Sequence, residues 1–172
     1  MMKWMGVVCI LTGALGMGWY LQQNLRRHLI LLGELKQALI CMRNELIYTR
    51  CPMSELYASA QQCVGMELKE CFVRLEEQTQ ENAQAEACQI WNSVWNLQSK
   101  QLGFTKEEQR ILRQAGQKLG GMEVNQQAEL LQFAQEQLEE RLEQYRRTQR
   151  QQEYLYRSLS LLGGLFLIIL LF

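Results

Sequence analysis

The residues of this sequence best suited to chemistry are six cysteines and one histidine. The cysteines stand at positions 9, 41, 51, 63, 71 and 88, and the histidine is His28. A zinc site needs closely spaced Cys or His ligands, and no two of these cysteines form a Cys-x-x-Cys pair. We therefore expect no metal site. We interpret the cysteines as reduced, buried thiols, which suit a cytosolic face better than an oxidising compartment.

No pattern in the sequence indicates a catalytic site. The Gln114–Met122 segment has glycines and a lysine but lacks the Lys-Ser/Thr ending of a phosphate-binding loop. The glycines between Gly13 and Gly18 follow no predicted strand, so they do not indicate a dinucleotide site. His28 follows an apolar run, and we interpret it as facing lipid headgroups rather than as a base. We expect a protein that is not an enzyme and binds no cofactor or small-molecule substrate.

The charge balance gives no reason to expect nucleic acid as a partner. The chain carries 18 Lys and Arg against 18 Asp and Glu, and its basic residues form no extended patch with interleaved aromatic residues. The acidic stretch Glu67–Glu86 is interpreted as a solvated face, with docking of a basic partner as the alternative. A single proline, together with abundant Gln, Glu, Leu and Arg, favours an all-helical fold.

An apolar run at the C-terminal end of the chain predicts a transmembrane anchor. Residues 158–172 carry no charge, and Arg157 before them has a side chain long enough to reach the headgroups. The run is short for a bilayer span, so a buried core helix or a re-entrant segment is the alternative. We favour membrane insertion because a core helix rarely lacks a polar face altogether.

A second apolar run, residues 1–21, predicts an N-terminal transmembrane helix. Lys3 is its only charge, and Trp19 and Tyr20 stand where an interfacial aromatic belt is expected. A cleaved signal peptide is the alternative. Small residues in both runs would allow the two helices to approach each other closely. These predicted packing residues are Ala14, Gly18, Gly163 and Gly164.

Basic residues flank both runs on the side of the central segment. Arg26 and Arg27 follow the first run, and Arg146, Arg147 and Arg150 precede the last. Because such residues stay on the cytoplasmic side, we expect both termini outside and residues 22–157 in the cytoplasm. The predicted domains are an N-terminal transmembrane helix (1–21), a cytoplasmic helical bundle (22–157) and a C-terminal transmembrane anchor (158–172).

Apolar residues recur at helical spacing throughout the central segment. We expect the helix over 26–48 to continue the first run and to end before the turn at Pro52. Shorter helices follow from Met53, Glu67 and Ala83, and Thr105–Glu108 forms a capping box before another. The last helix is predicted from Glu123 into the membrane, lying against the 26–48 helix. The expected fold is all-α, a helical bundle between two transmembrane helices, with a long C-terminal helix continuing into the membrane.

Several short motifs stand in a recognisable order along the chain. Leu35–Leu39 is followed by Glu45-Leu-Ile-Tyr48 with Pro52-Met53, a tryptophan-containing helix, Ala115–Gly120, and a long helix that begins with Gln126-Gln127. In order and spacing they resemble the stage III sporulation protein AB family of endospore-forming bacteria. The resemblance covers almost the full chain, and its most specific part is Glu45–Met53.

The resemblance implies a non-catalytic platform in the channel that joins mother cell and forespore during engulfment. The protein would lie in the mother-cell membrane, that is, the outer forespore membrane. Its soluble part would be similar to the cytoplasmic helical domain of type II secretion inner-membrane platform proteins. The implied partners are the membrane, a secretion-type ATPase of the stage III sporulation protein AA type, and other proteins of the same channel complex.

Three residues near the Pro52 turn are our candidate partner-binding residues. Glu45 offers a carboxylate, Tyr48 an aromatic ring with a polar tip, and Pro52 a rigid turn. The alternative is that Tyr48 and Pro52 only pack and turn the hairpin. A second functional hypothesis is a membrane-anchored coiled-coil adaptor that acts by self-association, although the polar stretch Gln149–Gln152 interrupts the apolar seam that it needs.

Overall fold

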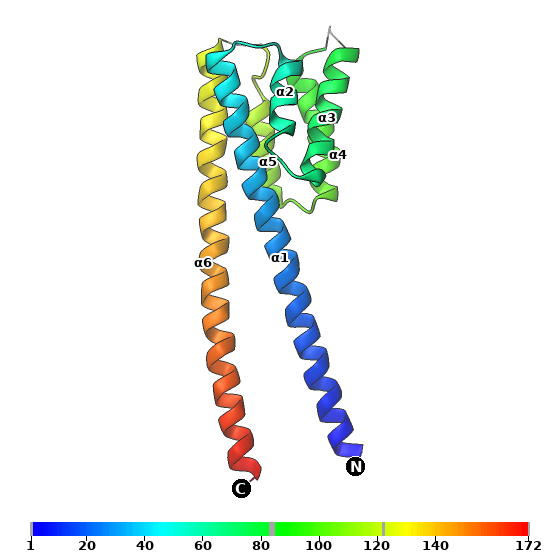
Figure 1. Cartoon of the computed structure of the whole chain (residues 1–172), viewed down its shortest axis with the longest axis vertical. Coiled ribbons are helices and arrows are strands. Elements are labelled where there is room, and N and C mark those ends of the chain that lie inside the picture. Colours follow the sequence, from blue (N-terminus) through cyan, green and yellow to red (C-terminus); the bar gives the residue numbers. More distant parts are fainter. Residues whose placement is uncertain (1, 83–84, 122, 172) are drawn as a thin grey trace. The chain divides into compact units, whose positions relative to one another are not determined.

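The computed structural model describes residues 2–82, 85–121 and 123–171, and the side chains of residues 23–82, 85–121 and 123–149. These residues form helices joined by short turns, without a β-strand among them (Figure 1). The helices are α1 (Met2–Tyr48), α2 (Met53–Gln61), α3 (Met66–Glu81), α4 (Ala87–Gln101), α5 (Lys106–Gly116) and α6 (Val124–Leu171). The predicted all-α fold is therefore confirmed.

The chain divides into two compact units, Met1–Leu138 and Glu139–Phe172. The first unit contains α1 to α5 and the beginning of α6. The second consists of the rest of α6, in which Arg147 Nη2 lies 3.1 Å from Glu143 Oε2, one helical turn away.

The expected membrane anchors, 1–21 and 158–172, lie outside the residues whose side chains are described. The same holds for Ala14, Gly18, Gly163 and Gly164. Among the residues that the structure does describe, no helix is both long and apolar enough to cross a bilayer.

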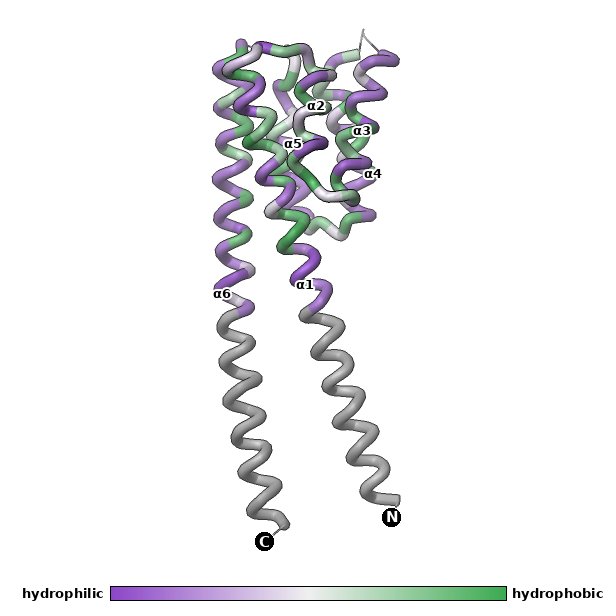
Figure 2. Tube along the Cα trace, in the orientation of Figure 1, coloured by the Kyte–Doolittle hydropathy of each residue, from purple (hydrophilic) through white to green (hydrophobic). Residues whose placement is uncertain are grey.

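The core of the first unit forms around an apolar stripe on α1. Leu32, Leu35, Leu39 and Met42 follow the three- and four-residue spacing of one helix face, and all are fully buried. Along α1 to α5, hydrophobic and hydrophilic residues alternate in the described part (Figure 2). Each of these helices therefore turns one face inward and one outward.

Two tryptophans of α4 occupy the centre of this core. Trp91 is fully buried and Trp95 is 3% exposed. The Trp91 indole Nε1 donates a 2.8 Å hydrogen bond to the carbonyl oxygen of Leu112, so its polar group is satisfied inside the core. The Trp91 ring lies between Tyr57, at a centroid distance of 6.2 Å, and Trp95, at 5.6 Å.

The helix boundaries differ from the sequence prediction at the start of α4. Gly65 caps the N-terminus of α3, and the preceding helix ends at Gln61. The fourth helix begins at Ala87, later than predicted. The next ends at Gly116, and the chain turns over residues 117–121, where Gly120 has a φ of +79°. Glycine adopts this conformation without steric cost.

The beginning of α6 lies beside α1, in line with the expected pairing of these helices. Arg43 Nη2 on α1 donates a 3.1 Å hydrogen bond to Gln132 Oε1 on α6. Leu131 and Leu138 of α6 are fully buried within the same unit.

The cysteines depart in part from the expectation of reduced thiols. Cys41 of α1 and Cys63, which follows α2, form a disulfide. That prediction was therefore wrong for these two. Cys51, Cys71 and Cys88 are free, and only Cys71 is buried. The disulfide closes a loop across the α1–α2 turn, so it fixes α2 against α1.

Candidate functional site

The helices of the first unit run alternately up and down, so their connections gather at two ends (Figure 1). The α2–α3 and α4–α5 connections lie at the end from which the N-terminal half of α1 extends. We call this the proximal end. The α1–α2 and α3–α4 connections lie at the opposite end, which we call the distal end.

The Glu45–Met53 corner stands at the distal end and joins α1 to α2. Glu45 Oε2 accepts a 2.8 Å hydrogen bond from the Thr49 hydroxyl, and the Glu45 carbonyl oxygen accepts one from the Thr49 N–H. Pro52 has extended geometry and caps α2, with its carbonyl oxygen accepting from Leu56 N–H. These contacts lie in the last turn of α1 and the first turn of α2, so they define where the two helices end and begin at the corner.

Tyr48, the last residue of α1, is 84% exposed. Packing inside the hairpin therefore does not explain its aromatic ring, whereas Pro52 does turn the chain there. The structure thus brings Glu45, Tyr48 and Pro52 together in one corner, with Glu45 half-buried and the other two exposed. An exposed tyrosine with a rigid backbone beneath it is the kind of residue that dominates many protein interfaces.

The distal end carries several exposed carboxylates. Glu55 in the first turn of α2, Glu81 at the end of α3 and Glu86 before α4 are all exposed. Burial, together with the negative charge of Glu45 and then Glu55, raises the pKa of the half-buried Cys51 thiol in this corner. The distal end therefore carries exposed carboxylates, and within the corner itself the exposed Arg50 stands beside Tyr48.

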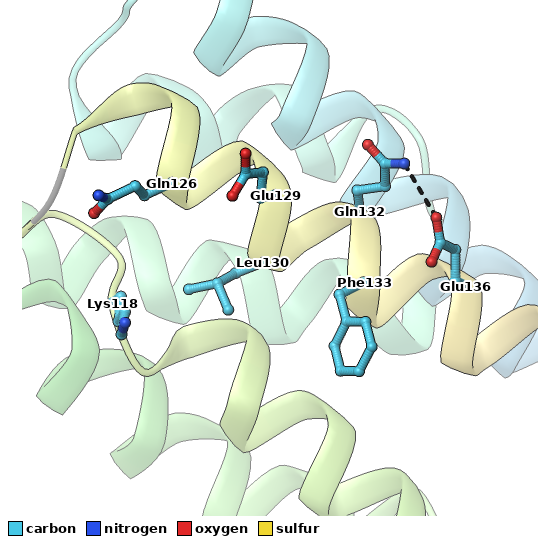
Figure 3. Close-up of a pocket in the computed structure, with 7 residues that line it drawn as sticks. All are labelled: Lys118, Gln126, Glu129, Leu130, Gln132, Phe133 and Glu136. Carbon is cyan, nitrogen blue, oxygen red and sulfur yellow. Dashed lines mark hydrogen bonds between the residues drawn. The ribbon is translucent and has the colours of Figure 1, made fainter.

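A groove of about 610 Å³ runs along the first turns of α6 (Figure 3). Its floor includes the apolar side chains of Leu130 and Phe133, and Phe133 is 46% exposed. We call it the α6 groove; it is lined by Lys118, Gln126, Glu129, Leu130, Gln132, Phe133 and Glu136. Gln132 Nε2 donates to Glu136 Oε1 at 3.1 Å, while its Oε1 accepts from Arg43, so the wall nearest α1 is held in place.

Sequence reasoning missed the α6 groove because it followed only the buried stripe of this helix. Leu130 and Phe133 stand three residues apart and outside the stripe that contains Leu131 and Leu138, which was a short but usable signal. On this second face Leu130 is half-buried beside the exposed Phe133. The pair offers an apolar surface for a further helix.

A buried polar cluster ties α1 to the start of α5. His28 Nε2 lies 3.0 Å from Glu108 Oε1, and the Thr105 N–H donates to Glu108 Oε2 at 2.7 Å. Glu108 is fully buried, and its capping box with Thr105 confirms that prediction. His28 has a side chain only 16% exposed, so its assignment to the lipid headgroups was wrong.

The cluster holds the Glu108 carboxylate in its ionised form. Burial raises the pKa of this carboxyl, but the hydrogen bonds from His28 and Thr105 more than offset the effect, so the pKa lies below its usual value. The His28 ring also packs edge-on against Phe104, at a centroid distance of 6.0 Å. Both carboxylate oxygens have partners within the domain, so the cluster joins helices rather than meeting a substrate.

The described residues offer two surfaces suited to binding a partner. In residues 23–82, 85–121 and 123–149, no group of three or more His, Cys or Glu side chains is placed to hold a metal ion. The acidic residues of α3 are largely engaged by neighbours: Glu67 with Arg27, Glu70 with Arg74, and Glu76 with Gln61. The corner and the α6 groove remain as the candidate partner-binding surfaces.

Comparison with known proteins identifies the family. The family model described as stage III sporulation protein AB matches residues 3–172. No curated protein and no solved structure matches the chain significantly. The family match covers nearly the whole chain, confirms the resemblance found in the sequence motifs and indicates a role in sporulation.

Proposed function

Because the chain belongs to the stage III sporulation protein AB family, we propose that it is a non-catalytic membrane platform of the mother cell–forespore channel. In this proposal the helical domain binds a secretion-type ATPase of the stage III sporulation protein AA type, together with other channel subunits. Two transmembrane helices, residues 1–21 and 158–172, hold the domain on the cytoplasmic side of the mother-cell membrane.

The observation that carries the proposal is the exposure of Tyr48 in the corner between α1 and α2. Its ring is 84% exposed although it ends a helix whose inner face is fully buried. The corner lies at the distal end, farthest from the N-terminal half of α1 (Figure 1). A partner approaching from the cytoplasm would meet this end of the domain first.

The continuity of α1 supports a role in transmitting force. This helix runs without interruption from Met2 to Tyr48, so it connects the apolar N-terminal run directly to the corner. At a rise of about 1.5 Å per residue, the segment from Leu21 to Tyr48 is roughly 40 Å long. The His28–Glu108 cluster and the Cys41–Cys63 disulfide fasten α5 and the end of α2 to this segment.

Co-purification of the ATPase with corner variants tests the proposal. The full-length protein carrying Tyr48→Ala, alone and with Glu45→Ala, would be extracted from sporulating membranes in mild detergent. We expect Tyr48→Ala to reduce recovery of the ATPase by more than about tenfold, as for an aromatic residue central to an interface. Helical circular dichroism should stay unchanged, because Tyr48 makes little contact with the core.

Leu97→Ala provides a matched control for this experiment. Leu97 is also a large apolar residue, 58% exposed, but it lies near the proximal end of α4. Its replacement should leave recovery of the ATPase unchanged. Equal recovery with wild-type protein and with Tyr48→Ala would reject the corner as the binding site.

Self-association is the second candidate function, and the exposed ring of Phe133 favours it. A second copy of the chain could cover the apolar face of α6 that contains Leu130 and Phe133. Light scattering of the full-length protein in detergent separates the two hypotheses. A stable dimer that Phe133→Ala converts to monomer would support the adaptor function, whereas a monomer that still binds the ATPase would support the platform.

A further inference from the structure

The proximal end of the domain carries an apolar patch that the proposed function does not use. Ile30 on α1 is 53% exposed, and Met66, the first residue of α3, is 88% exposed. Both line a groove of about 380 Å³, together with Arg26, Arg27 and the α2–α3 connection. We call Ile30, Met66, Arg26 and Arg27 the proximal patch.

Local contacts hold the proximal patch in a fixed shape. The Gly65 N–H donates a 3.1 Å hydrogen bond to Glu34 Oε2, which binds the α2–α3 connection to α1. Arg27 pairs with Glu67 through two hydrogen bonds, at 3.0 and 2.6 Å. Glu34 and Glu67, which line the same groove as Met66, therefore have partners within the domain. The Met66 side chain remains exposed.

The charge of the proximal end contrasts with that of the distal end. Exposed Lys69, Lys100 and Lys106 stand in the first or last turns of α3, α4 and α5, which all meet at the proximal end (Figure 1). Arg26 adds a further exposed cation beside Ile30. The solvent-accessible glutamates in these same turns are each paired with an arginine, so the lysines and Arg26 leave an excess of positive charge; the pairs are Glu67–Arg27, Glu70–Arg74 and Glu107–Arg110. A basic end with exposed apolar side chains is complementary to an anionic lipid surface.

The register along α1 agrees with a lipid surface at this level. If the apolar run ends at Leu21, Arg26 lies about 7.5 Å further along the helix, within reach of headgroups that extend roughly 5–7 Å beyond the hydrocarbon. Ile30 lies about 13.5 Å beyond Leu21 along the helix axis, so its side chain reaches the headgroup layer only when the helix is tilted. A helix tilt of about 20°, the average for membrane helices, would bring the Met66 side of α1 closer to the lipid.

We propose that the proximal patch docks on the surface of an anionic phospholipid bilayer and thereby fixes the tilt of the domain relative to the membrane. The inference rests on the proposed function, because it takes residues 1–21 as a membrane anchor. Met66 and Ile30 enter the interfacial layer, while Arg26 and the lysines of the proximal end contact lipid phosphates. The distal corner is then held away from the bilayer, facing the cytoplasm.

Photo-crosslinking of the full-length protein in vesicles tests this docking. Two variants would be reconstituted in vesicles with and without phosphatidylglycerol: Met66→benzoylphenylalanine and, as the control, Tyr48→benzoylphenylalanine. Lipid adducts would then be measured by mass spectrometry. We expect at least about fivefold more adduct at position 66 than at 48, and more with phosphatidylglycerol than with phosphatidylcholine alone. Arg26→Gln should lower the yield of lipid adduct at position 66 at least twofold. One basic residue near an anionic surface changes binding by about fivefold, which sets the upper limit of this effect.

Carbonate extraction of the same samples distinguishes failure of the proposed docking from failure of the proposed membrane anchor. Protein that resists carbonate but gives no lipid adduct at position 66 overturns the docking and leaves the anchor intact. A crosslink from position 66 to a second copy of the chain overturns it in favour of a protein contact. Release of the full-length protein by carbonate refutes the membrane anchor, and the docking with it.

Discussion

Gly116→Ala is the substitution for which the structure gives the sharpest expectation of lost stability. Gly116 ends α5 and is buried, and a Cβ added to it would overlap the Cδ1, Cγ and Nε1 atoms of Trp91. The Trp91 ring has little room to yield. It is fully buried between Tyr57 and Trp95, and its Nε1 donates to the Leu112 carbonyl oxygen at 2.8 Å.

The expected loss of stability has two sources, displacement of the Trp91 ring and loss of its hydrogen bond. Displacement within a packed core costs about 1–3 kcal/mol, and a lost hydrogen bond that leaves the buried indole N–H unsatisfied costs about 1–3 kcal/mol more. The higher helix propensity of alanine returns at most about 1 kcal/mol. We expect a net loss of about 1–6 kcal/mol in the free energy of unfolding, or a fall in Tm of roughly 2–24 °C.

Thermal unfolding of the full-length protein in detergent measures this loss by far-ultraviolet circular dichroism, and the near-ultraviolet signal reports the tryptophans directly. Gly33→Ala is the matched control, because nothing lies within 4 Å of a Cβ at this position in the middle of α1. It should leave Tm unchanged or raise it, since alanine is favoured in a helix by about 0.5–1 kcal/mol. A Gly116→Ala variant with the Tm and the near-ultraviolet spectrum of the wild type would refute the described packing of Trp91.

Two further predictions concern the pH and redox behaviour of the domain. Burial raises the pKa of Glu108, but the hydrogen bonds from His28 and Thr105 have the larger effect, and the pKa lies below the ordinary 4.5. The resulting stability is present above pH 4.5 and is lost as pH falls through the lowered pKa, so Tm should drop in that acid range and drop less in Glu108→Gln. At neutral pH, Glu108→Gln should itself cost about 1–3 kcal/mol, measured by the same melts. For Cys41 and Cys63, reduction with dithiothreitol opens the loop that fixes α2 against α1, so it should lower the free energy of unfolding by about 2–4 kcal/mol, measured by the same melts. An unchanged Tm after complete reduction would contradict this role of the disulfide.

Periodicity predicted the parts of this fold that depend on neighbours along the chain. Leu32, Leu35 and Leu39 share one helix face, so their burial follows from a spacing of three and four residues. The capping box at Thr105 and Glu108 is equally local. The turn at Pro52 follows from the geometry that proline imposes on the preceding residue.

Contacts between distant residues were beyond such reasoning. His28 meets Glu108 across 80 positions, so nothing near His28 in the sequence showed that it would be buried rather than facing lipid. The pairing of Cys41 with Cys63 depends on how α2 folds back along α1. Of the candidate site, the corner was predicted from its motif, whereas the α6 groove requires knowing which face of α6 the core leaves uncovered.

Protease accessibility in mother-cell protoplasts tests the central claim most directly, namely that both ends of the chain are anchored and the helical domain faces the cytoplasm. Trypsin would be added outside intact protoplasts, and fragments would be identified by antibodies against the α2–α5 region. Our account predicts that this region stays intact until the protoplasts are lysed and is digested afterwards. Digestion of the region in unlysed protoplasts would contradict the account.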